Sequence, residues 1–578
     1  MAIGSTSSAR NGIGAGEVET PRPAWARWLL PSIGDLIFVV MLALFTLTGL
    51  SVRLLGDAGI GWHIRTGQLI LATHAIPRVD PFSSSMTGQP WFAWEWLYDV
   101  IVGWLDRAAG LNGVVLFTAL MIAMVFAWSY RLLQRRGTNV AVALMLVLLA
   151  AGAAMIHFLA RPHVVSWLFT LLWFSILESS DPSPGSSGEI VREDEAKASG
   201  SRTPNAGCAW LPWLLPPSML LWVNLHGGFL VGFALLGIYS IDAVVRWFGF
   251  TGERQQGFED LLQKIRAGRR ARCLAVTAGL SGLATLVNPY GWRLQLHVYR
   301  YLSNRFLMDH IDEFQSPNFH LVAQRCFAGL LLLTLVALAT QRRALGERRT
   351  TEGLVVLFAV YFGLYASRNI PISSLLLILV IGPRLSDAMA GVSPGVTNRR
   401  VASLSRDFSS SKPSFLRRMQ AIDGTLRGHL WPAAAVLLIC WIAAHGGRLG
   451  ATPFMDAHFD GKRFPVRAVN YLEEHKVQGP VLAPDYWGGY LIYRLYPTYP
   501  TVRVVVDDRH DFYGEEFLKS YLKMVHVEPG WDQFLREHNP YCVLVPANSA
   551  LGNIMAEGSD WKIVDADGVA RMFVRAGE

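Results

Sequence analysis

The chain has 578 residues, of which 52% are hydrophobic and 17% are charged, and it contains 20 Trp. This composition is too apolar for an ordinary soluble protein of that length. The formal net charge is +8, but the basic residues lie between hydrophobic stretches. That arrangement favours anchoring to anionic lipid and argues against nucleic-acid binding. The five cysteines have no CxxC spacing, so neither a disulfide framework nor a thiolate zinc site is indicated.

The N-terminal residues 1–32 are Gly/Ser-rich and lack a signal-peptide pattern, so we expect a disordered cytoplasmic segment. Hydrophobic stretches long enough to enter a bilayer then recur, and each should be helical because lipid offers no partner to backbone groups. They predict about eleven spans, at residues 33–52, 112–131, 139–158, 164–178, 208–223, 229–247, 273–289, 323–340, 352–367, 370–389 and 430–448.

The placement of Lys and Arg predicts which loops face the cytoplasm. With the N-terminus inside, the inner segments carry 26 Lys and Arg residues and the outer segments before the tail carry 9. An odd number of spans then places the tail outside. The sequence therefore predicts a multi-pass protein of the bacterial inner (plasma) membrane, with a periplasmic or extracellular C-terminal domain.

The stretch from Trp91 to Leu105 is apolar enough to be a further span. It contains Glu95 and Asp99, and Asp106 follows it, at four- and seven-residue spacings near one helical face. A span here would turn Arg135-Arg136 outward. We therefore expect an amphipathic helix at the outer surface, within a first outer loop of residues 53–111.

Two long polar segments interrupt the predicted membrane domain of residues 33–448. Residues 179–207 are rich in Ser, Asp, Glu, Gly and Pro, and residues 391–429 are basic and polar. Both are interpreted as inner loops, the first of them flexible and serving as a connector.

The tail, residues 449–578, is predicted to be a small α/β domain. Its expected elements are helices at 466–475 and 515–525 and strands at 480–483, 502–506, 542–545 and 572–574. Tyr486 to Tyr490 and Asp507 to His510 each follow a predicted strand. Ligand sites in α/β sheets lie at such positions, although the same residues are equally consistent with ordinary turns.

Polar clusters at the predicted span ends all fall on the outer face. Any one arginine there is more often an interfacial anchor, and any one histidine is more often structural. Their common location nevertheless favours a shared cavity, because ionisable groups at membrane depth are costly. Asp57 is the candidate catalytic base. The candidate substrate-binding residues are Trp62, His63, Arg65, Asp80, Glu95, Arg161, His163, Asn224, His226, Arg293 and Arg368.

The guanidinium groups of Arg161 and Arg368 suit a phosphate, since each offers paired donors to its oxygens. His163 and His226 can donate to a phosphate or orient the base. These roles describe an enzyme that acts on a phosphorylated substrate at the membrane surface.

The first outer loop carries the motif Gly56-Asp57, Trp62-His63, Thr66-Gly67, Asp80-Pro81-Phe82-Ser83 and Glu95-Trp96-Leu97. This pattern resembles the GT-C superfamily of multi-spanning glycosyltransferases, of the protein-mannosyltransferase and aminoarabinose-transferase type, and most of all an uncharacterised bacterial branch. Arg161-Pro162, His226-Gly227, Arg368-Asn369 and Trp487-Gly488-Gly489-Tyr490 extend the likeness along the chain.

The resemblance implies a polyprenyl-phosphate-linked sugar donor, an acceptor of unknown kind and an inverting transfer with Asp57 as the base. It also implies two surface helices in the first outer loop, near 62–73 and 91–107. Where the established enzymes often have an acidic pair, this chain has Asp57-Ala58. A divalent metal is possible, with Asp80 and Asp312-Glu313 as candidate ligands, and metal dependence stays open.

Two alternatives belong to other functional classes. A transporter or flippase for a lipid-linked or anionic substrate would place polar groups near the midplane and show inverted repeats, and neither is visible. A non-catalytic membrane scaffold with a binding domain would need Trp487 or Asp507 and could dispense with Asp57.

Overall fold

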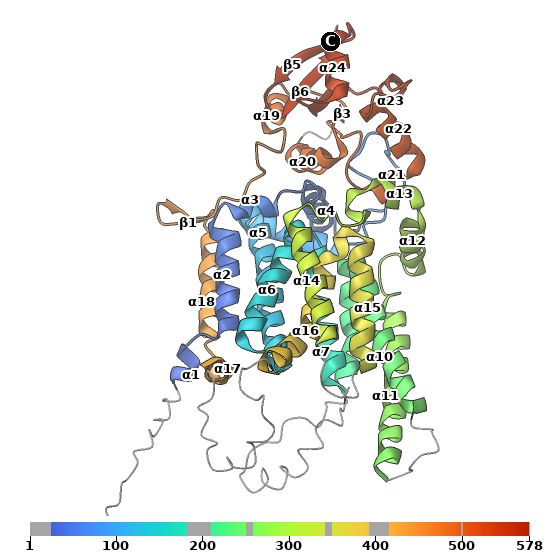
Figure 1. Ribbon diagram of the computed structural model, residues 1–578. Helices are drawn as coiled ribbons and strands as arrows, with labels where there is room; N and C mark the ends of the chain where they lie inside the picture. The colour runs from blue at the N-terminus through green and yellow to red at the C-terminus, as the bar shows by residue number, and fades with distance from the viewer. Residues whose placement is uncertain are drawn as a thin grey trace, which may run out of the picture.

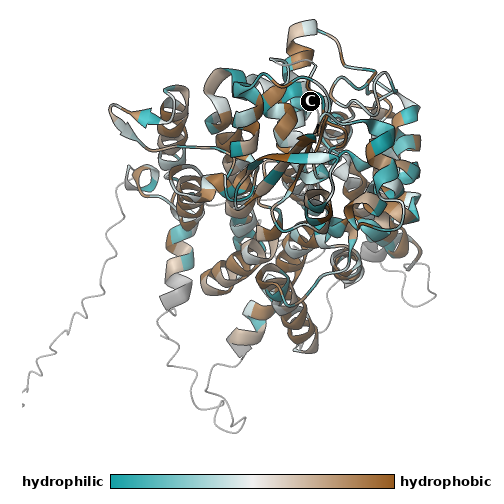
Figure 2. Cartoon of the chain, turned by 90° about the horizontal axis from the view of Figure 1, so that it is seen from above, coloured by the Kyte–Doolittle hydropathy of each residue, from teal (hydrophilic) through white to brown (hydrophobic). Residues whose placement is uncertain are grey.

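The computed structural model describes residues 25–181, 210–249, 258–340, 349–391, 415–498 and 501–576. The predicted disorder before residue 25 lies outside these ranges, as do most of the 179–207 loop and much of the 391–429 loop. The described chain forms a bundle of apolar helices with a small α/β domain at one end, at the top of Figure 1. Figure 2 shows the bundle helices coloured largely as hydrophobic.

The bundle helices follow the predicted hydrophobic stretches. They are α2 (Ile33–Leu47), α5 (Trp96–Arg135), α6 (Val140–Ala154), α7 (His163–Ser179), α9 (Leu215–Leu225), α10 (Leu230–Gly249), α11 (Phe258–Ala284), α14 (Val322–Ala339), α15 (Arg349–Tyr365), α16 (Ile370–Gly391) and α18 (Leu430–Ala444).

Within the described ranges, six helical stretches are long and apolar enough to cross a membrane, or seven if the bent pair Met419–Thr425 and Leu430–Ala444 is one span. Three further apolar helices are shorter, among them His163–Ser179 and Leu211–Leu225. At 1.5 Å per residue, the 11 residues of α9 cover about 16 Å, roughly half of a hydrocarbon core. A membrane protein is thus supported, whereas the count of eleven spans is not confirmed.

Arg136, which the sequence places in an inner loop, is mostly enclosed by the bundle. Its side chain is 11% exposed, and it pairs with Glu178 of α7 and, at 2.9 Å, with Glu352 of α15. Arg384 of α16 joins the same glutamate. Buried cations need such partners, so this arginine ties three helices together.

The first outer loop contains the two expected helices. The first is α4 (Gly59–Thr73), which follows the short α3 (Leu50–Leu54). The second is the beginning of α5, which starts at Trp96 and leaves helical geometry at Ala109 and Gly110, where Gly110 has φ 60°. The kink separates the predicted surface helix from the span that follows, and residues 91–95 precede the helix.

The C-terminal domain contains a four-stranded sheet in the order β3-β4-β6-β5. Strands β3 (Val481–Leu482) and β4 (Cys542–Pro546) are parallel, while β6 (Ala570–Arg575) pairs antiparallel with both β4 and β5 (Trp561–Ala566). The surrounding helices are α19 (Val466–Glu474), α20 (Asp485–Leu495), α21 (His510–Tyr513), α22 (Glu515–Val525), α23 (Asp532–His538) and α24 (Ala550–Glu557).

One prediction for this domain is wrong, and one of two open interpretations is excluded. Residues 502–506 do not form a regular strand, although Val504 makes isolated bridges to Val481 and to Ser83 of the first loop. Of the two interpretations of Tyr486 to Tyr490, the ordinary turn is excluded, because these residues lie in the first part of α20. Glycines at 488 and 489 hid this helix, because glycine is a poor helix former. Tyr486 and Trp487 line the cavity described below.

Glycines allow the C-terminal domain to pack directly on the first outer loop. A Cβ at Gly61 would lie 2.0 Å from the carbonyl oxygen of Gly489, and a Cβ at Gly489 would lie 2.2 Å from that of Ala58. Since real Cβ contacts are not shorter than 3.0 Å, α4 and α20 meet backbone to backbone. This contact brings residues 507–511 over the residues that follow α3.

Candidate functional site

One cavity of about 1070 Å³ lies where the bundle, the first outer loop and the C-terminal domain meet. Its walls include most of the polar residues that the sequence predicts on the outer face. The predicted site residues that line it are Asp57, Trp62, His63, Glu95, Arg161, His163, His226 and Arg368. A volume of this size suits a large ligand rather than a single ion.

Arg161 stands among carboxylates from three separate segments. Its Nη2 atom contacts Asp57 Oδ1 at 2.6 Å and also pairs with Asp508, while Nη1 lies 3.8 Å from Glu313 Oε1. Burial lowers the pKa of the Arg161 guanidinium, but the charges of Asp57, Asp508 and Glu313 outweigh this and raise it. We call Arg161 and these three acids the arginine–carboxylate centre.

Asp57 lines the cavity, and its two carboxylate oxygens differ in their hydrogen bonds. Oδ1 accepts hydrogen bonds from the backbone N–H of Gly59 at 2.7 Å and from Arg161. Oδ2 has no hydrogen-bond partner among the residues that the structure describes. The carboxylate is therefore held in orientation with a free oxygen, as a general base requires.

Asp508 comes from the C-terminal domain, just before α21. The sequence places it in a possible ligand segment, Asp507 to His510, but not among the candidate site residues. Its Oδ1 accepts from Trp62 Nε1 at 2.9 Å, and its Oδ2 pairs with Arg161. Burial and the negative charge of Asp57 raise the pKa of the Asp508 carboxyl to about 7, although the positive charge of Arg161 lowers it. A Cβ at Gly59 would lie 2.5 Å from Asp508 Oδ2, so glycine leaves the room that this acid occupies.

Glu95 lies between two imidazoles on another part of the cavity wall. Its oxygens are 3.8 Å from His63 Nε2 and 3.7 Å from His226 Nε2. Burial and the charge of Asp511 raise the pKa of Glu95 to about 8, while burial and Arg368 lower the pKa of His226 to about 3. Near neutral pH these groups are mainly uncharged and can hydrogen-bond hydroxyl groups without adding net charge.

Arg368 is the second arginine of the cavity and differs from Arg161 in its partners. Its guanidinium lies over the Phe314 ring, 4.5 Å from the centroid. No carboxylate of the described ranges lies within 4.0 Å of it, whereas Arg161 has three. Its charge is therefore available to an anion entering the cavity.

An apolar stretch continues the cavity along the membrane helices. It is lined by residues of α10 and α15, namely Leu230, Val231, Ala234, Phe358, Tyr361, Phe362 and Tyr365. Leu230 is 43% exposed, Tyr361 66% and Tyr365 54%. Since both helices lie in the apolar bundle, this side of the cavity opens toward the region that lipid would occupy.

Four predicted site residues do not line the cavity. Arg65 donates to the backbone oxygen of Tyr493 at 2.8 Å and so joins α4 to α20. Asn224 accepts from Trp96 Nε1 and donates to the Val287 carbonyl. Arg293 is exposed on α12 (Trp292–Ser303). These three residues therefore fit a structural or interfacial role better than a substrate-binding role.

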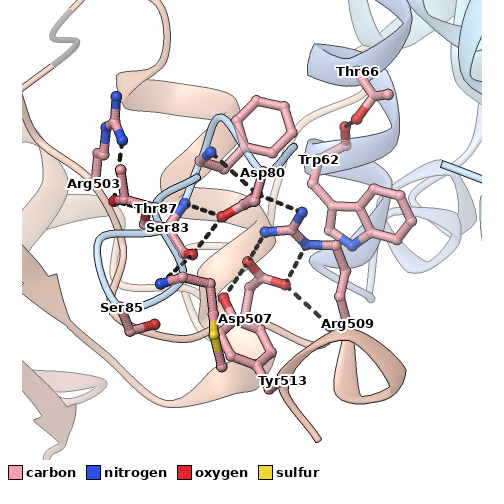
Figure 3. A network of polar contacts seen from close by, with 12 residues as sticks. Trp62, Thr66, Asp80, Ser83, Ser85, Thr87, Arg503, Asp507, Arg509 and Tyr513 are labelled. Atoms are coloured by element: carbon pink, nitrogen blue, oxygen red, sulfur yellow. Dashed lines mark hydrogen bonds and ion pairs between the residues drawn. The ribbon is translucent and has the colours of Figure 1, made fainter. Parts of the chain in front are cut away.

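Asp80, the fourth, belongs to a buried ion-pair network shown in Figure 3. Arg509 Nη1 contacts Asp80 Oδ1 at 2.8 Å, and its Nη2 contacts Asp507 Oδ2 at 2.7 Å. Tyr513 donates to the same Asp507 oxygen. The network fastens the first outer loop to the segment that carries Asp508, so Asp80 and Asp507 act as positioning residues.

The C-terminal domain adds further groups that sequence reasoning did not select. Asp485 accepts from Tyr521 at 3.1 Å and lies 2.7 Å from His510 Nε2. Asp511 lies 2.9 Å from His297 Nε2. The acidic pair Asp507-Asp508 after a predicted strand indicates a possible ligand site. The sequence does not indicate which of the two acids lines the cavity.

The sequence does not decide whether a divalent metal ion binds here. The geometry of the carboxylates does not fit such an ion. The carboxylates of Asp57, Asp508 and Glu313 converge, but they converge on the guanidinium nitrogens of Arg161. Among the described residues no group of three or more His, Cys, Asp or Glu has the geometry to hold a metal ion. Asp80 is engaged by Arg509.

No family model matches the chain, and no curated protein matches it either. Among solved structures, it is similar to the Archaeoglobus fulgidus oligosaccharyltransferase tethered with an acceptor peptide, with 12% identity, coverage of 89% of this chain and 68% of that chain, and a TM-score of 0.49. It is also similar to ArnT from Cupriavidus metallidurans bound to undecaprenyl phosphate, with 13% identity, coverage of 94% and 97%, and a TM-score of 0.45.

Proposed function

We propose that this protein is an integral membrane glycosyltransferase that moves a sugar from a polyprenyl-phosphate-linked donor to an acceptor. The reaction takes place on the outer face of the bacterial plasma membrane, beneath a C-terminal domain that is periplasmic or extracellular. The placement of Lys and Arg in the sequence supports this orientation.

The observation that carries the proposal is the combination of groups around one cavity. Asp57 offers a free carboxylate oxygen, Arg368 offers a guanidinium with no carboxylate partner among the described residues, and an apolar side lies along α10 and α15. A donor with a phosphate head and a long hydrocarbon chain needs the last two, and a hydroxyl or amine acceptor needs the first.

In the proposed reaction, Asp57 Oδ2 takes the proton from the acceptor hydroxyl or amine as that atom attacks the anomeric carbon. The new glycosidic bond forms while the bond from that carbon to the phosphate oxygen breaks. The electron pair leaves with the lipid phosphate, whose growing negative charge Arg368 stabilises. Attack opposite the leaving group inverts the anomeric centre.

The test uses the full-length protein in liposomes with a panel of polyprenyl-phosphate sugars and outer-membrane or cell-wall acceptors. Asp57→Asn keeps the size of the side chain and removes the base, so we expect transfer to fall by roughly 10²–10⁴-fold. Binding of the lipid donor should be unchanged. Asp456→Asn is the matched control, since its side chain is 86% exposed and lies outside the cavity.

Full transfer by Asp57→Asn would refute the assignment of the base. Movement of intact donor across the liposome, without transfer and unaffected by Asp57→Asn, would instead identify a transporter. Binding of donor or acceptor without either process would identify a scaffold.

A further inference from the structure

We propose that Arg161 is the fixed cation of the catalytic centre, in the position that a divalent metal ion would otherwise take, so that this chain works without one. The catalytic part of this inference rests on the proposed function, but its ion-binding part does not. The argument depends on which atoms the three carboxylates face.

The three acids approach Arg161 from three different parts of the chain. Asp57 follows α3, Glu313 lies in the short turn η5 (Asp312–Phe314), and Asp508 belongs to the C-terminal domain. Asp57 Oδ1 lies 2.6 Å from Arg161 Nη2, and Asp508 Oδ2 contacts the same nitrogen. Glu313 Oε1 lies 3.8 Å from Arg161 Nη1. Such convergence of like charges is stable only around a cation.

Here the cation is part of the chain. Burial raises the pKa of Glu313, but Arg161, His157 and Arg368 outweigh it and bring the pKa to about 2. The guanidinium thus already occupies the place between the acids that a metal ion would take, and it compensates Glu313. A divalent ion at the same place would have to displace Arg161 or accept its repulsion at contact distance.

The surroundings restrict the movement of Arg161 on two sides. A Cβ at Gly59 would lie 2.8 Å from Nη2, so the backbone of α4 closes one side of the guanidinium. The side chain of Arg161 is 25% exposed, and Trp62 fixes Asp508 on another side. The arginine is therefore packed into the centre and does not sit on its surface as an exposed ion pair.

The same placement gives Arg161 a role distinct from that of Arg368. It orients Asp57 and Asp508 and keeps their charges together when a phosphate enters near Arg368. A guanidinium cannot lose its proton at any ordinary pH, so this cation is always present. A metal ion in its place would be bound only at sufficient concentration.

The first experiment measures Mn²⁺ binding to the purified full-length protein, by titration with detection of free Mn²⁺. Wild type should show no saturable site in this centre with a Kd below about 1 mM, the weak end for carboxylate sites. Arg161→Ala should gain one such site, because it leaves three carboxylates without their cation. Adding Asp508→Asn to Arg161→Ala should remove the new site.

Arg305→Ala is the matched control, because Arg305 is 93% exposed and faces one carboxylate, that of Asp309. It should bind Mn²⁺ as wild type does. If Arg161→Ala does not fold, Arg161→Gln removes the charge and keeps a polar side chain that can hydrogen-bond. The inference is overturned if wild type has a Mn²⁺ site that Asp57→Asn or Asp508→Asn abolishes, or if a folded Arg161 variant gains no site.

The second experiment measures transfer after extensive treatment with EDTA. Wild type should keep its rate within about twofold, and Arg161→Ala should lose roughly 10²-fold, the usual cost of removing a preorganised charge. Loss of wild-type transfer that Mn²⁺ or Mg²⁺ restores would contradict the inference. Absence of transfer under every condition would count against the proposed function, while the Mn²⁺ titration would still test the role of Arg161.

Discussion

The contact between α4 and α20 gives a prediction that can be worked out from distances. Gly489 lies in α20, and a Cβ there would be 2.2 Å from the carbonyl oxygen of Ala58, against a lower limit of 3.0 Å for real contacts. Gly489→Ala must therefore separate the two backbones by about 0.8 Å. Alanine is a better helix former than glycine, so α20 itself should not be weakened.

This displacement acts directly on the arginine–carboxylate centre. The hydrogen bond from Trp62 Nε1 to Asp508 Oδ1 is 2.9 Å long. A shift of 0.8 Å along it would give about 3.7 Å, which is no longer a hydrogen bond. A misplacement of about 1 Å at a catalytic group can reduce turnover roughly 10²-fold, and we expect a loss of that order for Gly489→Ala.

The measurement combines transfer in liposomes with hydrogen–deuterium exchange of the whole protein. Exchange should increase in α4 and α20 and stay constant in α6. Gly279→Ala is the matched control, since Gly279 lies in helix α11 and a Cβ there meets nothing within 4 Å. Wild-type transfer and exchange in Gly489→Ala would refute the idea that this close contact positions Asp508.

Two further predictions concern buried charge. Burial raises the pKa of Asp508 from its ordinary 3.8 to about 7, so the folded chain binds more protons than the unfolded chain between these values, and stability should fall as pH rises from about 4 to 7. Asp508→Asn should have a shallower fall in thermal midpoint over this range, and equal slopes would contradict the assignment. Arg509→Ala leaves Asp80 and Asp507 buried without their cation, so it should lower the free energy of unfolding by about 3–5 kcal/mol. The control is Arg467→Ala, at a pair whose arginine is 62% exposed, and it should lower that free energy by less than about 1 kcal/mol. Similar thermal midpoints for the two variants would disprove the anchoring role of Arg509.

The bundle helices and the two helices of the first outer loop could be predicted, because each depends on a local sequence pattern. The apolar stretch of α6 and the short apolar runs of β4 and β6 are visible in short windows of sequence. The number of spans could not be predicted in this way. A helix as short as α9 is decided by its packing against neighbouring helices, which hydropathy does not report.

A site residue could be predicted where its own position at the predicted outer end of a span was sufficient to select it. Asp57, Arg161 and Arg368 were selected for that reason, and all three line the cavity. Asp508 and Asp507 are adjacent in sequence, yet Asp508 faces the cavity while Asp507 is bound by Arg509. Their opposite roles follow from the docking of α20 on α4, which depends on a contact between distant segments.

The hydrogen bond between Trp62 and Asp508 joins residues that are 446 positions apart in sequence. The centre is therefore incomplete through almost all of biosynthesis, since Asp508 is made after the whole bundle. A nascent chain can insert and pack its apolar helices while it still lacks one wall of the cavity. The site is completed late; under the proposed function, a partly made protein would not consume lipid-linked sugar.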